Sequence, residues 1–127
     1  MSALVLDAGA FVAVDRSDRS MIARLRVAQQ HGIELRTSAI VIAQVWRDPE
    51  GRQAGLARLL RAVDVRPIDE RSGREAGILI GRAGTSDPID ATVVLTASHG
   101  DRIVTSDPRD IKRLAATAHK RVAIIAC

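Results

Sequence analysis

The stretch ALVLD, at residues 3–7, decides the fold of this chain. Four consecutive aliphatic residues without polar alternation are typical of a short strand that is buried on both faces of a sheet. The run ends at Asp7, a charged residue directly after the buried segment. The opening therefore predicts a central strand with an acidic side chain at its carboxyl end.

Working outward from this strand, short apolar runs alternate with segments of helical periodicity. Ser17 or Asp18 is expected to cap the second helix, Thr37-Ser38 the third and Asp48-Pro49 the fourth, and Gly84 to end the fifth. Strands are expected at residues 3–6, 33–36, 63–68, 102–105 and 122–126. Helices are expected at residues 9–14, 21–30, 39–46, 51–62, 69–82, from 87 onward and 107–118.

This alternation predicts a three-layer α/β/α domain, with helices on both faces of a central five-stranded parallel sheet. Right-handed crossovers leave few arrangements, and the plausible strand order is 3-2-1-4-5. We expect residues 1–127 to form a single domain, because 127 residues suit one hydrophobic core. Ligands of such sheets bind where the strand order reverses, here between strands one and four.

Composition narrows the possible functions. The chain carries a formal charge of +4 with a pI of about 10.5, and Lys112 and Lys120 are the only lysines among 19 basic residues. A basic balance favours anionic partners such as nucleic acid, although the arginines are scattered and also suit a solvated surface. Phe11 and Trp46 are the only aromatic residues, so the sequence offers no platform for stacking bases.

Cysteine usage and hydropathy bear on the compartment. Cys127 is the only cysteine, which excludes an internal disulfide framework or a cysteine-based metal site. The apolar start lacks a basic segment before it and is interrupted by Asp7 and Gly9, unlike a signal peptide. No apolar run approaches the roughly 20 residues of a membrane span. A cytoplasmic location without a membrane partner is expected.

Two acids are expected to meet at the reversal of strand order. Asp7 ends strand one, and Asp107 follows strand four. Two close carboxylates repel unless one takes a proton or a cation lies between them, and oxygen ligands suit Mg²⁺ or Mn²⁺. Helix capping is the competing role, because TSDPID at 85–90 and TSDPRD at 105–110 are both good helix openings.

Four motifs carry a family resemblance: LVLDAGAF (4–11), SAIVIAQVW (38–46), DPIDATVVLTA (87–97) and IVTSDPRDIKRL (103–114). In this order and spacing, they resemble the PIN-domain family, most of all the VapC-like ribonuclease toxins of type II toxin–antitoxin systems. The resemblance spans essentially the whole chain. It implies a PIN-like fold, RNA as substrate, a small antitoxin protein as partner and a homodimer.

The resemblance also implies a site. Asp7, Asp90 and Asp107 match the family's acids, which hold one or two Mg²⁺ or Mn²⁺ ions and cut RNA to leave a 5′-phosphate and a 3′-hydroxyl. Thr105 is expected to orient an acid or a water molecule. Asp87 and Asp110 are expected to be auxiliary, with capping favoured for Asp87.

Gln44 departs from the family pattern, which usually has Glu on the helix after strand two. An amide can offer its carbonyl oxygen to a metal or a water molecule, but it brings no charge and cannot act as a general base. Gln44 is therefore assigned the positioning of water. The alternative is a catalytically weakened or inert PIN-fold module that binds RNA or a protein partner.

Overall fold

A computed structural model describes residues 2–127, in which five strands form one parallel sheet. They are β1 (Leu4–Leu6), β2 (Leu35–Ser38), β3 (Val63–Arg66), β4 (Arg102–Thr105) and β5 (Ala123–Ala126). The order is β3-β2-β1-β4-β5 and every pair is parallel, which confirms the predicted topology. All three residues of β1 are buried, as the unbroken aliphatic run requires.

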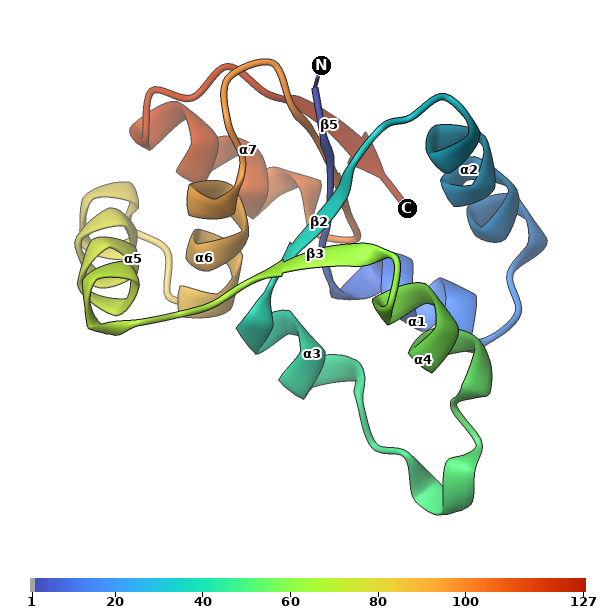
Figure 1. The fold of residues 1–127 in the computed structure, drawn as a ribbon. Coiled ribbons are helices and arrows are strands. Elements are labelled where there is room, and N and C mark those ends of the chain that lie inside the picture. Colours follow the sequence, from blue (N-terminus) through green and yellow to red (C-terminus); the bar gives the residue numbers. More distant parts are fainter. Residues whose placement is uncertain (1) are drawn as a thin grey trace.

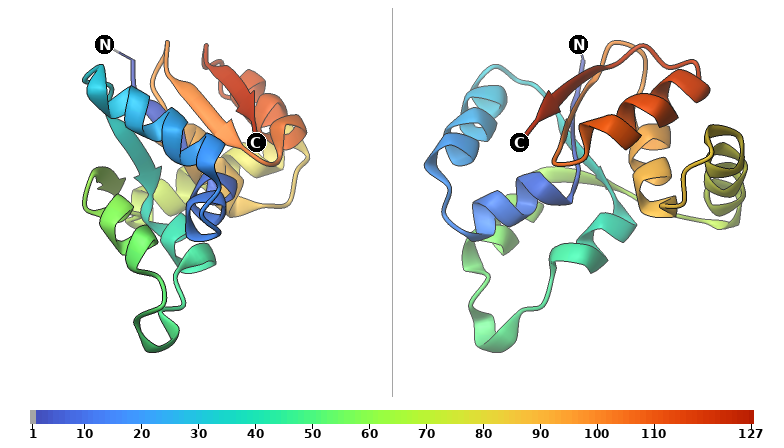
Figure 2. Two further views of the ribbon diagram at one scale, coloured as in Figure 1. Left: turned by 90° about the vertical axis from the view of Figure 1, so that its right-hand side faces the viewer. Right: turned by 180° about the vertical axis from the view of Figure 1, so that it is seen from behind.

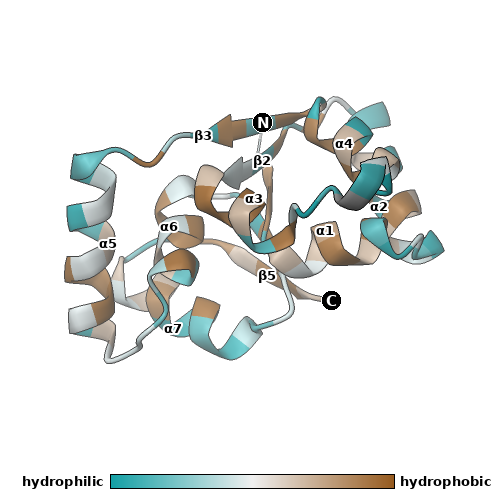
Figure 3. Ribbon diagram, turned by 90° about the horizontal axis from the view of Figure 1, so that it is seen from below, coloured by the Kyte–Doolittle hydropathy of each residue, from teal (hydrophilic) through white to brown (hydrophobic). Residues whose placement is uncertain are grey.

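Helices cover both sides of the sheet (Figures 1 and 2). α1 (Ala8–Asp15), α2 (Arg19–Gln30) and α4 (Ala54–Leu60) lie on one side, and α5 (Glu70–Ala83), α6 (Pro88–Thr96) and α7 (Pro108–Thr117) on the other. α3 (Ala39–Val45) packs between α1 and α6 (Figure 3). The three-layer α/β/α architecture is confirmed.

The core is almost entirely aliphatic. β1, the inner residues of β4 and Phe11 of α1 are fully buried or nearly so, and one continuous cluster extends from them to α6 and α7. α5 lies farther out and packs on α6 and α7 through Ala76, Leu79 and Ala83. None of the helices within residues 2–127 combines the length and the apolar character that crossing a membrane demands.

The second strand lies two residues later than its predicted bounds of 33–36. Thr37 and Ser38, interpreted from the sequence as helix caps, belong to β2 and are fully buried. The Thr37 hydroxyl donates to the Leu6 carbonyl at 2.7 Å, and the Ser38 hydroxyl pairs with that of Thr92 at 2.9 Å. Ser38 precedes α3 but makes no capping hydrogen bond, because its hydroxyl is bonded across to α6.

The predicted helix opening at Asp48-Pro49 is wrong. Asp48 has a φ of +42° and Glu50 a φ of +57°, and a short 3-10 turn (Pro49–Gly51) precedes α4, which begins only at Ala54. The buried side chain of Gln53 holds this loop instead. Its amide oxygen accepts from the backbone N–H groups of Arg47 and Asp48, and its amide nitrogen donates to the Val45 carbonyl.

Candidate metal centre

Four acids lie at the ends of elements that meet at the carboxyl edge of β1 and β4. Asp7 follows β1, Asp90 lies in the first turn of α6, and Asp107 and Asp110 lie at the start of α7. Carboxylate oxygens of Asp90, Asp107 and Asp110 all lie within 4.8 Å of one another. The fold thus brings together Asp90 and Asp110, which are twenty positions apart in the sequence.

Asp90 has the most perturbed environment of the four. Its side chain is buried, with 5% of the residue exposed, and its Oδ2 atom has no hydrogen-bond partner. Burial, together with the negative charges of Asp7, Asp87 and Asp107, raises the pKa of this carboxyl to about 7. A buried, unpartnered carboxylate oxygen among other acids needs a proton or a cation to compensate it.

Asp7 lies beside this cluster and is fixed by Thr105. The Thr105 hydroxyl donates to Asp7 Oδ2 at 2.7 Å and accepts from the backbone N–H of Asp107 at 2.9 Å. Asp7 Oδ1 accepts from the N–H of Ala8. Because each carboxylate oxygen keeps a further lone pair, Asp7 remains able to bind a cation. Thr105 joins the ends of β1 and β4 through one hydroxyl.

Asp87 and Asp107 both precede a helix within the same TSDP sequence, but only the side chain of Asp87 caps its helix. Asp87 Oδ1 accepts from the N–H groups of Ile89 and Asp90, so it caps α6, the role favoured for it. Asp107 occupies the same position before α7, but its side chain makes no capping hydrogen bond. The carboxylate of Asp107 is therefore available to the cluster.

Asp110, which the sequence predicts to be auxiliary, belongs to the group of close carboxylates. Asp107 and Asp110 are three residues apart at the start of one helix, a spacing that places side chains on the same face. That spacing was the sequence signal for grouping them. Asp110 supplies a third carboxylate to a cluster in which only an auxiliary role was expected of it.

Gln44 lies in the last turn of α3, and its side chain is exposed. Because α3 packs between α1 and α6, it lies between the helices that follow Asp7 and carry Asp90. The amide brings no charge to this side of the site. The negative charge of the cluster comes from the strand ends and from α6 and α7.

The donor set fits a hard divalent cation. Three carboxylate oxygens lie close together, one buried oxygen lacks a partner, and neither His nor Cys belongs to the cluster among residues 2–127. Oxygen-only ligands of this kind suit Mg²⁺ or Mn²⁺ better than Zn²⁺.

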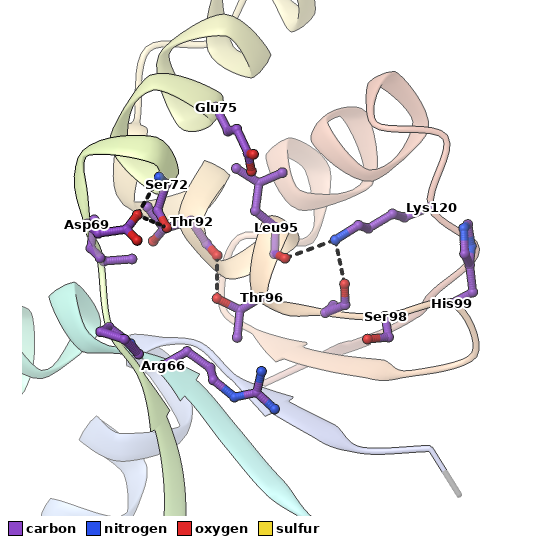
Figure 4. Close-up of a pocket in the computed structure, with 13 residues that line it drawn as sticks. Arg66, Asp69, Ser72, Glu75, Thr92, Leu95, Thr96, Ser98, His99 and Lys120 are labelled. Atoms are coloured by element: carbon purple, nitrogen blue, oxygen red, sulfur yellow. Dashed lines mark hydrogen bonds between the residues drawn. The ribbon is translucent and has the colours of Figure 1, made fainter.

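A separate hollow of about 600 Å³ lies at the other end of α6, bordered by Arg66, Asp69, Thr96 and Lys120 (Figure 4). There the Lys120 ammonium donates to the carbonyls of Val94, Leu95 and Ala97, which end the helix. Burial lowers the pKa of Lys120. Its three hydrogen bonds satisfy the carbonyls at the end of α6, so we assign Lys120 a structural role.

The architecture and the acidic edge together define a class: the chain has the fold of a VapC-like PIN domain, with a five-stranded parallel sheet in the order 3-2-1-4-5. Similar solved structures include VapBC2 from Rickettsia felis bound to a DNA fragment from their promoter, with 16% identity and a TM-score of 0.70. That match covers 96% of this chain and 98% of the other.

A second similar structure is DNA-bound VapBC from Salmonella typhimurium, with 17% identity, a TM-score of 0.69 and coverage of 98% of both chains. No protein-family model matches this chain, and no curated protein matches it either. At such low identity, the two structures establish a shared fold. The function has to be argued from the site.

Proposed function

We propose that this chain is a metal-dependent endoribonuclease, the VapC-like toxin of a toxin–antitoxin pair, which hydrolyses RNA phosphodiesters. The observation that carries the proposal is the buried Asp90 oxygen without a partner, surrounded by Asp7, Asp107 and Asp110. A divalent cation, Mg²⁺ or Mn²⁺, would compensate this oxygen.

In this proposal Asp90 and Asp107 hold the cation, together with Asp7 as inferred from the family motif, and Asp110 adds charge at the cluster. When bound, the cation activates water and offsets charge on the scissile phosphate. Thr105 keeps Asp7 oriented through its hydroxyl. Gln44 positions water by hydrogen bonding and cannot take its proton.

The proposal extends to partners and location. The VapBC structures support a small antitoxin protein as a partner of this chain. RNA as substrate agrees with the net charge of +4, which favours association with polyanions. We further propose a homodimer and a cytoplasmic location, which follow from the family resemblance and from the single cysteine.

Gln44 favours a second candidate, an inert PIN-fold module that binds RNA or a protein without cutting. The missing carboxylate on α3 removes one charge from the cation site and the one general base that α3 would supply. Under this alternative the acids retain their arrangement but do not support hydrolysis.

Cleavage of structured RNA in Mg²⁺ or Mn²⁺ separates the two candidates. The nuclease proposal predicts cleavage by the wild type and a loss of about 100-fold or more in Asp7→Asn, since a cation ligand is removed. It also predicts that Gln44→Glu cleaves at least as fast as the wild type. A wild type that is inactive with every divalent metal, combined with activity in Gln44→Glu, would establish the inert module.

A further inference from the structure

A cavity of about 570 Å³ lies beside the acidic edge, between α1, α2 and the carboxyl ends of β4 and β5. Its lining includes Ala8 and Gly9, which directly follow Asp7, and Ser106, which directly precedes Asp107. The cavity is therefore lined by the chain neighbours of Asp7 and Asp107, on the side of the sheet covered by α1 and α2. Its size is within the range of small-molecule sites, roughly 300–1,000 Å³.

The lining of this cavity combines apolar side chains with the positive charges of two arginines. Val12, Ala13 and Met21 contribute aliphatic surface, and Arg16 and Arg24 are exposed at its border. Asp18 also borders it, but its carboxylate accepts from the N–H of Met21 as the cap of α2. The two guanidinium groups thus outnumber the one carboxylate.

Gly9 lines the cavity at a point where Ser106 and Cys127 pack against α1. A Cβ atom at this position would lie 2.9 Å from Cys127 Sγ and 3.0 Å from Ser106 Cβ. Glycine therefore permits the end of β5 and the turn after β4 to approach α1.

We propose that this cavity binds the nucleotide next to the scissile phosphate of an RNA substrate, an inference that rests on the proposed nuclease function. The apolar wall contacts the base, and Arg24 with Arg16 contacts the adjoining phosphate. The lining has no aromatic side chain, so the base is held by aliphatic contact and shape and is not stacked on a ring. This subsite selects a single-stranded nucleotide, because a base that is paired in a duplex cannot turn out of the helix into the pocket.

Cys127 provides a probe inside the cavity, because it is the only cysteine of the chain and is exposed. Its thiol is close enough to Asp7 and Arg24 for both charges to act on its pKa. Burial raises the pKa of the thiol, the Asp7 charge raises it further and Arg24 lowers it. Occupation of the cavity by a nucleotide would cover the sulfur atom.

The first test measures alkylation of Cys127 by N-ethylmaleimide in EDTA, where no cleavage occurs. We expect a short single-stranded RNA to slow alkylation at least about fivefold, because a bound nucleotide covers the thiol. Inorganic polyphosphate at the same phosphate concentration should slow it less than twofold. Equal protection by polyphosphate, or no protection by RNA, would overturn the proposal.

The second test compares Arg24→Gln with Arg26→Gln, two exposed positions on α2 of which only Arg24 borders the cavity. RNA affinity is measured by fluorescence anisotropy over a range of salt concentrations. Arg24→Gln should weaken binding about fivefold and lower the salt slope by about 0.7, and Arg26→Gln should change affinity less than twofold. Equal effects of the two substitutions would contradict the assignment.

These readouts do not require cleavage, so they separate two kinds of failure. Protection of Cys127 without RNA hydrolysis by the wild type with any metal would support the subsite and refute the nuclease. Hydrolysis without protection, and with equal effects of Arg24→Gln and Arg26→Gln, would support the nuclease and refute the subsite.

Discussion

At the residue scale, the carboxyl of Asp90 combines burial, negative neighbours and an oxygen without a hydrogen bond. Its pKa of about 7 means that the metal-free protein holds it largely protonated below that pH. In the proposed metal site, a cation would compete with this proton, because both would compensate the same oxygen. The proposal therefore links proton occupancy and metal occupancy at one atom.

This linkage gives the stability of the metal-free protein a defined pH dependence. The folded-state pKa of Asp90 is raised, so its contribution to stability is fully present below the unfolded value of 3.8 and is lost as the pH rises to about 7. We expect the urea midpoint of Asp90→Asn to exceed that of the wild type at pH 8, and the difference to shrink toward pH 4.

Stabilisation of the folded protein by Mn²⁺ should increase with pH in the same urea titrations, whereas the contribution of the Asp90 proton decreases. Metal at about 100 times its Kd should stabilise the wild type by about 2.7 kcal/mol at pH 8, less at pH 6, and Asp90→Asn hardly at all. An Mn²⁺ effect on the wild type that is independent of pH, or retained in Asp90→Asn, would show that Asp90 is not a ligand.

The sequence could group the acids of the site but could not predict the hydrogen bonds and burial of each one. The motifs indicated Asp7, Asp90 and Asp107 together, but the environment of each depends on three-dimensional neighbours. The twin TSDP stretches show this directly, because only Asp87 of the pair Asp87 and Asp107 caps its helix. The four shared letters alone do not separate them; the family motif favoured capping for Asp87 and the acidic site for Asp107, and only the contacts show which side chain caps.

At the element scale, hydroxyl groups at the strand ends join the segments that carry the acids. Thr105 connects β4 to Asp7, and Thr37 connects β2 to the carbonyl of Leu6, just before Asp7. Ser38 at the end of β2 pairs with Thr92 of α6, two residues after Asp90. These buried bonds fix α6 relative to the sheet.

Thr92→Val tests this connection at nearly constant side-chain volume. It leaves the buried Ser38 hydroxyl without its partner, and we expect the free energy of unfolding to fall by about 1–3 kcal/mol in urea titrations. Thr96→Val is the matched control on the same helix, because the Thr96 hydroxyl bonds only to the helix carbonyl of Thr92. It should cost less than about 0.5 kcal/mol.

Thr92→Ser, which keeps the hydroxyl, should recover most of the loss. Equal destabilisation by Thr92→Val and Thr96→Val would mean that the bond to Ser38 does not fix α6.

Buried side-chain hydrogen bonds also explain the element boundaries that sequence reasoning missed. β2 extends through Ser38, and Asp48 does not open α4, because buried side-chain bonds of Ser38 and Gln53 override local capping preference.

At the scale of the whole molecule, the strand order followed from the sequence because it depends on long-range regularities. Unbroken aliphatic runs such as residues 3–6 require cover on both faces, and right-handed crossovers restrict the order. The VapBC structures share this fold at 16 and 17% identity. At such low identity the fold is shared, but the distances between individual acids, such as that of Asp110 from Asp90 and Asp107, have to be read from the structure.

Anomalous scattering from a crystal of this protein soaked in Mn²⁺ at pH 8 tests the central claim most directly. We expect a peak within about 2.5 Å of carboxylate oxygens of Asp90 and Asp107, with Asp7 or Asp110 beside it. The same soak of an Asp90→Asn crystal should show a weakened peak or none. No peak at the carboxyl edge of β1 and β4, or a peak held by other residues, would contradict the account.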